Sequence, residues 1–138
     1  MDGNTAQGEK SALDAREDKV RSVMAGLKHL AMIRRQCETA VRKLPAGSAE
    51  RKRMRAYIFD IDSTVQMASG VVDRLEGSDP GFGSVFRMAY IDNLTNDAIA
   101  NMLGISKRTV IRRRNRIVSA IAADDELYTL FTGGESNG

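Results

Sequence analysis

Residues 96–115 read NDAIANMLGISKRTVIRRRN, and this stretch decides the predicted fold because it has the spacing of a helix-turn-helix unit. With Asn96 as the first position, Ala100 is the fifth, where two crossing helices leave no room for a large side chain. Gly104 is the ninth, where the chain leaves the first helix and a residue without Cβ adopts a positive φ at low cost. Val110, the fifteenth, is expected to pack back on the first helix.

The residues around this turn agree with the same helix boundaries. Ser106 follows the turn, and its hydroxyl is predicted to cap the second helix, as the hydroxyl of Thr95 is predicted to cap the first. Ile99, Leu103 and Ile105 supply further apolar contacts. Such a spacing also occurs in ordinary helical hairpins, so the charge of the second helix is needed to indicate a function.

The second helix of the unit, predicted from about Lys107 to Ala122, has one apolar and one strongly basic side. No acidic residue lies between Asp97 and Asp124. Like charges one turn apart destabilise a helix by a few tenths of a kcal/mol, and an external polyanion removes that repulsion. The pattern therefore favours DNA over a merely solvated basic helix. The apolar side contains Val110, Ile111, Ile117, Val118 and Ile121, and the basic residues are Lys107, Arg108, Arg112, Arg113, Arg114 and Arg116.

Residues near the N-terminus of this second helix are predicted to face base edges in the major groove of double-stranded DNA. The base-contact candidates are Lys107, Arg108 and Arg112. Other residues are expected to hold phosphates, which positions a helix without reading sequence. These candidates are Thr95, Ser106, Thr109, Arg113 and Arg116, of which Thr95 and Ser106 can equally serve only as caps. Neutralising about 5 or 6 phosphates predicts a salt slope of about −0.9 per contact.

The longer run from Tyr90 to Ala122, YIDNLTNDAIANMLGISKRTVIRRRNRIVSAIA, resembles region 4 of the sigma-70 family. It is most similar to the small phage and prophage regulators of the ArpU type. The resemblance implies a transcriptional regulator that places its second helix in the major groove of a promoter or operator. One departure is Arg113 at the eighteenth position, which is more often apolar in this motif. The shared elements are Tyr90-Ile91, Leu94-Thr95, Ile99-Ala100, Leu103-Gly104, Ser106, Thr109-Val110 and the Arg112 to Arg116 cluster.

Length and composition agree with a small helical protein. The chain has 138 residues, no Trp and only two Pro, and it is 42% hydrophobic and 28% charged, as folded chains are. Cys37 is the only cysteine, which excludes an internal disulfide and fits a reducing compartment. No apolar run reaches membrane-spanning length, and the polar N-terminus has no signal-peptide core. We therefore expect a cytoplasmic protein of a bacterial or phage-infected cell, without a membrane partner.

Two long helices are predicted before the DNA-binding unit. Apolar residues recur at alternate spacings of three and four, typical of a coiled-coil seam, and Arg34 alone interrupts the first run. The rhythm resumes after Pro45-Ala46-Gly47, where Ser48 is the expected N-cap. Residues 17–76 should thus form an antiparallel hairpin of two helices, each of about 25 residues and about 38 Å long. The seam contains Val20, Val23, Leu27, Leu30, Cys37, Val41 and Leu44, then Met54, Ile58, Ile61, Val65, Ala68, Val72 and Leu75.

A lone pair of helices buries little apolar surface, so the hairpin should recruit either the C-terminal unit or a second copy of itself. We predict a homodimer, in which two recognition helices address two half-sites. The hairpin tip is strongly basic and is opposed only by Glu50. A solvated helix end explains it most simply, and a secondary phosphate contact is the alternative. The basic residues are Arg42, Lys43, Arg51, Lys52, Arg53 and Arg55.

The remaining segments are predicted to be linker, scaffold or tail. Residues 1–16 are polar and are expected to be disordered. Gly77 to Gly81 is a linker by composition, and Ser84 should cap a scaffold helix that begins the DNA-binding domain, residues 84–123. The tail, residues 124–138, contains an apolar patch that is expected to pack on the DNA-binding unit or to dock on RNA polymerase or another protein. The patch consists of Leu127, Tyr128, Leu130 and Phe131.

A competing motif is FDIDSTV at residues 59–65, which resembles the first motif of haloacid-dehalogenase-type phosphatases. In that family the positions of Asp60 and Asp62 hold a nucleophile and a general acid beside Mg²⁺, on the loop after a buried strand. The preceding residues 51–55 are too basic for such a strand. A helix turns by about 100° per residue, so the two carboxylates would point about 200° apart. We predict two surface carboxylates, with no metal, no cofactor and no enzyme activity.

These observations together predict an all-α fold in which a long antiparallel helical hairpin precedes a three-helix helix-turn-helix domain. The predicted function is sequence-specific transcriptional regulation. The alternative from a different class is an oligomeric phage assembly protein of the small-terminase type, in which the hairpin oligomerises and DNA contact serves packaging.

Overall fold

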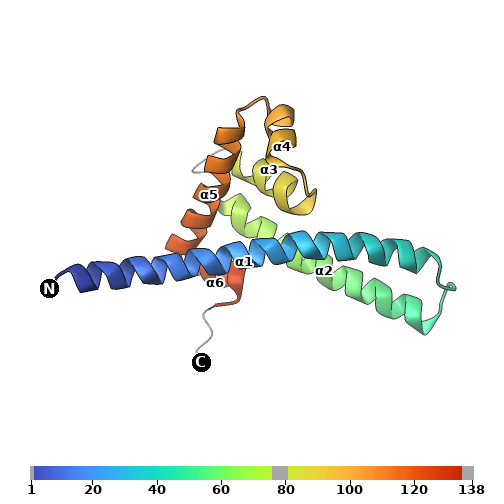
Figure 1. Ribbon diagram of the computed structural model, residues 1–138. Helices are drawn as coiled ribbons and strands as arrows, with labels where there is room; N and C mark the ends of the chain where they lie inside the picture. The colour runs from blue at the N-terminus through green and yellow to red at the C-terminus, as the bar shows by residue number, and fades with distance from the viewer. Residues whose placement is uncertain (1, 76–80, 135–138) are drawn as a thin grey trace.

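A computed structural model describes residues 2–75 and 81–134 of the chain, with side chains from residue 12 onward. Throughout these residues the fold is all-helical, as predicted. Two long helices form an antiparallel hairpin, and the shorter helices gather over one half of it (Figure 1). The elements are α1 (Asp2–Arg42), α2 (Ala49–Leu75), α3 (Phe82–Phe86), the π-helix η1 (Arg87–Ile91), α4 (Asn96–Leu103), α5 (Lys107–Ala123) and α6 (Asp125–Thr132).

The hairpin turns where the sequence predicted it. Gly47 has a φ of 79°, in the left-handed region that favours glycine. The Ser48 hydroxyl accepts a hydrogen bond from the Arg51 backbone N–H at 3.1 Å and so caps α2. The Arg51 guanidinium also donates to the Leu44 carbonyl at 3.2 Å, which ties the start of α2 to the end of α1.

The predicted apolar seam lies between α1 and α2, and the interruption at Arg34 has a polar partner on the opposite helix. Arg34 Nε lies 2.5 Å from Asp62 Oδ1, and Arg34 Nη1 lies 2.6 Å from Glu38 Oε1. The hydrogen bond to Asp62 raises the pKa of Arg34 above its usual value, Glu38 adds to this effect, and burial opposes it. Residues 59–65, the phosphatase-like motif, lie inside α2 rather than on a loop after a strand.

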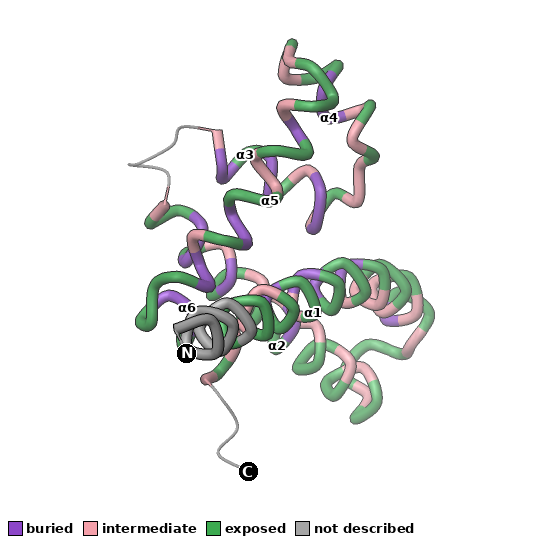
Figure 2. Tube along the Cα trace, turned by 60° about the vertical axis from the view of Figure 1, so that its left-hand side comes forward, coloured by how far each residue is buried: buried purple, intermediate pink, exposed green. Residues whose placement is uncertain are grey.

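One hydrophobic core joins the hairpin to the C-terminal helices. Its buried members come from the middle of α1, the C-terminal half of α2, and the helices from α3 to α6 (Figure 2). Phe86 is central: its ring packs against Tyr90 at 5.5 Å and Phe131 at 6.4 Å between centroids. The hairpin therefore packs against the C-terminal unit, which is the first of the two arrangements expected for its apolar surface. The largest fully buried side chains are Phe86, Met24, Ile99, Ile117 and Ile121.

The N-terminal part of α1 contacts the C-terminal region through Arg16. Helix α1 begins at Asp2, and the disorder expected for residues 1–16 stays a prediction. Arg16 donates to Asp125 Oδ1 at 2.7 Å and to the Ala122 carbonyl at 3.2 Å, and its guanidinium lies 4.6 Å from the centre of the Tyr128 ring. These partners lie more than a hundred residues away in the chain, so local composition did not reveal them.

The start of the C-terminal unit also differs from the prediction. Helix α3 begins at Phe82, Gly81 is its N-cap with a φ of 101°, and Ser84 lies exposed inside the helix without capping it. Burial of Phe82 explains the earlier start, because it adds an apolar contact that a helix beginning at Ser84 would lack. Most of the predicted linker, residues 77–80, lies outside the described residues.

The tail forms helix α6, which the sequence did not predict as a separate element. Asp124 caps it, accepting from the Leu127 N–H at 3.0 Å. Leu127, Tyr128 and Phe131 are buried against α1, α2 and α5, while Leu130 is 40% exposed. The apolar patch therefore packs within the chain, as the first of its two expected roles requires. Residues 135–138 lie outside the described residues. None of the described helices is long and apolar enough to cross a membrane.

Candidate nucleic-acid interface

Helices α4 and α5 form the predicted helix-turn-helix, and both predicted caps are present. Thr95 accepts a hydrogen bond from the Ala98 N–H, and Ser106 accepts one from the Thr109 N–H, each at 3.1 Å. Gly104 has φ 68° and ψ 33°, and the following Ile105 N–H donates back to the Ala100 carbonyl at 3.0 Å. This pattern closes α4 and directs the chain into α5.

The inner side of α5 holds it on the scaffold. Val110 is fully buried against α4, whose Ala100 is 7% exposed, as the spacing of the motif requires. Ile111 differs from the prediction: it is 41% exposed, because it lies at the edge of the apolar side rather than inside it. The remaining buried residues of α5 are Ile117, Val118, Ile121 and Ala122.

The outer side of α5 carries a row of three exposed arginines, Arg108, Arg112 and Arg116. They follow each other at intervals of four residues, so their side chains lie on the same face one turn apart. Among the described residues, Arg108 and Arg112 have no ion-pair partner. A shallow groove along this face is lined by Arg108, Ile111, Arg112, Asn115, Arg116 and Ser119, and no acidic side chain contributes to it.

The N-terminal end of α5 contains the third predicted base-contact residue. Lys107 Nζ lies 3.6 Å from Asp97 Oδ1, and both side chains are largely exposed. Exposed pairs of this kind contribute about 1 kcal/mol or less, so a phosphate or a base can replace Asp97 as the partner. The hydroxyls of Ser106 and Thr109 lie 2.9 Å apart beside it.

Arg114 is directed inward, unlike its neighbours in the basic cluster. Its Nη1 donates to Asn96 Oδ1 at 2.6 Å, and its Nε and Nη2 donate to the Tyr90 hydroxyl at 3.2 and 3.0 Å. The guanidinium also lies 4.9 Å from the centre of the Tyr90 ring. Arg114 thus fixes α5 to η1 and to the start of α4, which positions the outer arginines.

Arg113, a predicted phosphate contact, lies on a different side from the arginine row. It is half-buried, and a Cβ atom at Gly81 would come within 2.9 Å of its Nη1. The guanidinium therefore packs on the backbone at the start of α3. This contact shows how a charged residue is accommodated at the eighteenth position of the motif, where an apolar one is more usual.

Three residues of the outer groove, Ile111, Asn115 and Ser119, were missing from the predicted site. Asn115 is exposed beside Arg112 and Arg116, and Ile111 lies one turn before Asn115. The helical period carried the signal, because residues 108, 112 and 115 fall on neighbouring rows of one face. Ile111 was predicted to belong to the apolar side of this helix.

Residues 10–124 match the sequence profile of the ECF sigma factor family, which covers most of the chain. Among curated proteins and solved structures, none matches this chain. Members of the matched family are non-enzymatic, DNA-binding transcription initiation factors that recognise promoters and bind the RNA polymerase core. The match includes the helix-turn-helix and the hairpin alike, so the relationship extends well beyond the motif of α4 and α5. The chain belongs to the ECF sigma factor family.

Proposed function

We propose that this protein binds a specific double-stranded promoter sequence through the outer face of α5, and that this contact helps to start transcription there. The observation that carries the proposal is the exposed row of Arg108, Arg112 and Arg116 along a groove that no acidic side chain lines. Guanidinium groups match both guanine edges and phosphates, the two features that a major-groove helix meets.

The residues of the interface receive different roles. Lys107, Arg108 and Arg112 are proposed to read bases, since they lie in the first two turns of α5. Arg116 lies farther along the helix and is proposed to hold a phosphate. Thr95, Ser106 and Thr109 surround the N-termini of α4 and α5, where hydroxyls and free N–H groups bind phosphate oxygens. Arg113 is proposed to hold a phosphate, which requires its guanidinium to leave Gly81.

Selection of bound duplexes from a random pool would identify the target sequence, and mobility shifts on that duplex then test the roles. Arg112→Ala should relax the base preference at one position of the duplex. It should also reduce the binding free energy for the preferred base there by about 1 to 3 kcal/mol. Arg116→Ala should weaken binding to all sequences alike. Lys19→Ala is the control, because Lys19 is an exposed cation of α1 that belongs to none of the proposed contacts. Unchanged binding by both α5 variants would overturn the proposal.

The link to transcription can be tested separately. Purified RNA polymerase core and this protein should together start transcription from a template that carries the selected sequence, and the core alone should not. Arg112→Ala should reduce this initiation as much as it reduces DNA binding. Initiation that is insensitive to the selected sequence would contradict promoter recognition by α5.

Several narrower predictions stay predictions. The homodimer was predicted because the hairpin needed apolar cover, but the C-terminal helices supply that cover within one chain. The ArpU-type phage origin and the small-terminase alternative have no additional support from the fold. Light scattering separates the alternatives, because a packaging subunit should form a ring and a regulator a monomer or dimer.

A further inference from the structure

Helix α1 carries a second row of basic residues, Arg21, Lys28, Arg35 and Arg42. They recur every seven residues, and each directly follows a seam position. All four are exposed. The seam itself has a seven-residue period, so the row keeps a constant position beside it along the whole hairpin. We call these four residues the α1 basic row.

The α1 basic row resembles α5 in its charge pattern. No acidic residue lies between Asp18 and Glu38 in the sequence. Arg21 lies 3.8 Å from Glu17 and 4.0 Å from Asp18, distances that are long for ion pairs. Within the described part of the chain, Lys28, Arg35 and Arg42 form no ion pair, and Glu38 lines the same pocket as Arg42. A polyanion would therefore find Lys28 and Arg35 without competition from internal carboxylates.

One end of the row lies beside the proposed recognition helix. Arg21 and Lys28 line the same groove as Ile111 and Asn115 of α5 and Asn96 of α4. This groove connects the α1 basic row with the face that we propose reads DNA. A duplex that lies against α5 therefore passes the first two cations of α1.

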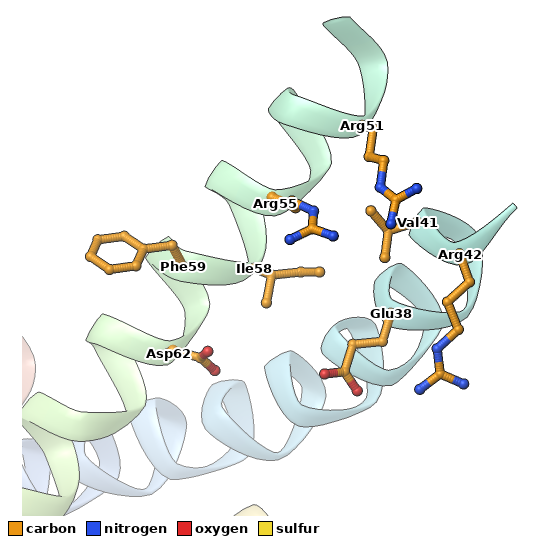
Figure 3. Close-up of a pocket in the computed structure, with 8 residues that line it drawn as sticks. All are labelled: Glu38, Val41, Arg42, Arg51, Arg55, Ile58, Phe59 and Asp62. Atoms are coloured by element: carbon orange, nitrogen blue, oxygen red, sulfur yellow. The ribbon is translucent and has the colours of Figure 1, made fainter. Parts of the chain in front are cut away.

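The other end of the row lies at the hairpin tip. Arg42 borders a pocket together with Arg51 and Arg55, as Figure 3 shows, and Phe59 is 70% exposed at its edge. Arg42 follows Lys28 by fourteen residues, which is about 21 Å along a helix. The row thus extends well past the region that the C-terminal unit covers.

We propose that the α1 basic row binds the phosphate backbone of the same duplex, to one side of the α5 site. This inference depends on the proposed function of α5. In the proposed complex α5 lies across the duplex in the major groove, and α1, from which α5 rises steeply (Figure 1), runs along the duplex. At about 3.4 Å per base pair, Arg35 and Arg42 lie about 3 and 6 base pairs beyond Lys28. An acidic protein surface is the competing partner, but the shared groove with α5 favours DNA.

Phosphate ethylation interference on a 40-base-pair duplex that carries the selected sequence provides the test. The variant is Arg35→Gln with Arg42→Gln, since these two residues lie farthest from α5. The control is Lys19→Gln with Arg74→Gln, which removes two exposed charges that belong neither to the α1 basic row nor to the hairpin tip. Arg74 pairs with Glu126 of α6 at 3.0 Å, and both side chains are exposed. Circular dichroism should show the same helix content in all proteins.

Two results are expected from the Arg35 and Arg42 variant. Interference at phosphates on one side of the α5 site should disappear, while the pattern at the site itself stays the same. The slope of log K against log salt concentration should become less steep by about 2, because each of the two lost contacts contributes about 0.9 to its magnitude. The control pair should keep both the pattern and the slope of the wild type.

Other results would overturn the inference. An unchanged interference pattern in the Arg35 and Arg42 variant would show that the row does not touch the duplex. An equal loss of slope in the control pair would show a general effect of charge. If the wild type bound no duplex at low salt, the proposed function of α5 would fail, and this inference with it. A wild type that binds normally beside an unchanged variant refutes only the α1 contact.

Discussion

The two halves of the hairpin differ in what stabilises them. In the half that meets the C-terminal helices, Val20, Met24 and Val72 are at most 1% exposed and belong to the shared core. In the distal half, Val41 and Ile61 are buried outside that core, and the seam contains the Arg34 and Asp62 ion pair. Figure 2 shows the contrast as buried segments around α5 and mostly exposed ones toward the tip.

This difference indicates a division of roles along one pair of helices. The proximal half orients α5, because α1 and α2 both pack against it. The distal half has few tertiary contacts and many exposed charges, so its surface can change with little effect on folding. Substitutions in the two halves should therefore differ in the property that they alter: stability in the proximal half and surface interactions in the distal half.

Phe86→Ala should have the largest effect. Phe86 is 1% exposed and contacts Tyr90 and Phe131, so its truncation should lower the free energy of unfolding by about 3 to 5 kcal/mol. Phe59→Ala is the matched control on the distal hairpin, where the ring is 70% exposed, and it should change stability by less than about 0.5 kcal/mol. Urea unfolding measures both values. Similar costs for the two variants would contradict the contrast between the halves.

Arg114→Ala should lower the free energy of unfolding by about 2 kcal/mol, because it leaves Tyr90 and Asn96 without their charged donor. Arg112→Ala removes the same charge two residues earlier and should leave stability almost unchanged. Thermal unfolding and DNA mobility shifts on both variants separate the two properties. If Arg112→Ala destabilised the fold as much as Arg114→Ala, the outer row would be structural.

Gly104→Ala should destabilise the protein by about 1 kcal/mol, since φ is 68° there and an L side chain tolerates that conformation poorly. No atom lies within 4 Å of the added Cβ, so the cost is conformational rather than steric. Gly70→Ala in the interior of α2 also meets no atom within 4 Å, and it should stabilise by about 0.5 to 1 kcal/mol. Opposite signs in denaturant unfolding are the expected outcome.

The Arg34 and Asp62 pair should show the smallest effect. Its side chains are 34% and 39% exposed, so a double-mutant cycle with alanine should give a coupling of about 0.5 kcal/mol that decreases with salt. The pKa of Arg34 is raised in the folded state, so its contribution is complete below the unfolded pKa and is lost only at higher pH. Stability from this pair should therefore stay constant between about pH 7 and 9. A coupling above about 2 kcal/mol would mean that the distal hairpin is held more strongly than its exposure indicates.

Local signals were sufficient for the helix-turn-helix and the hairpin turn. Thr95, Gly104 and Ser106 each have a conformational role that depends on immediate neighbours, and the structure has all three in those roles. The seam of the hairpin was also predictable, because a period of seven is visible without knowledge of the partner. In the candidate site, the exposure of Arg108, Arg112 and Arg116 follows from the same helical period.

Contacts between distant segments account for what the sequence did not reveal. Arg16 donates to Ala122 and Asp125 of the C-terminal region, and neighbouring residues in the sequence give no sign of these contacts. Arg113 and Arg114 are adjacent in a uniform basic cluster, yet one packs on Gly81 and the other donates to Tyr90. Residue type alone does not distinguish an arginine that faces solvent from one that holds two helices together.

The seven-residue repeat of the seam also determines how the hairpin can change in length. Adding seven residues to each of α1 and α2 near the tip would lengthen it by about 10.5 Å and restore every seam position. Insertions of three or four residues would instead rotate the tip relative to α5, because they break the repeat. Homologous proteins with longer or shorter hairpins should therefore differ by whole repeats in both helices.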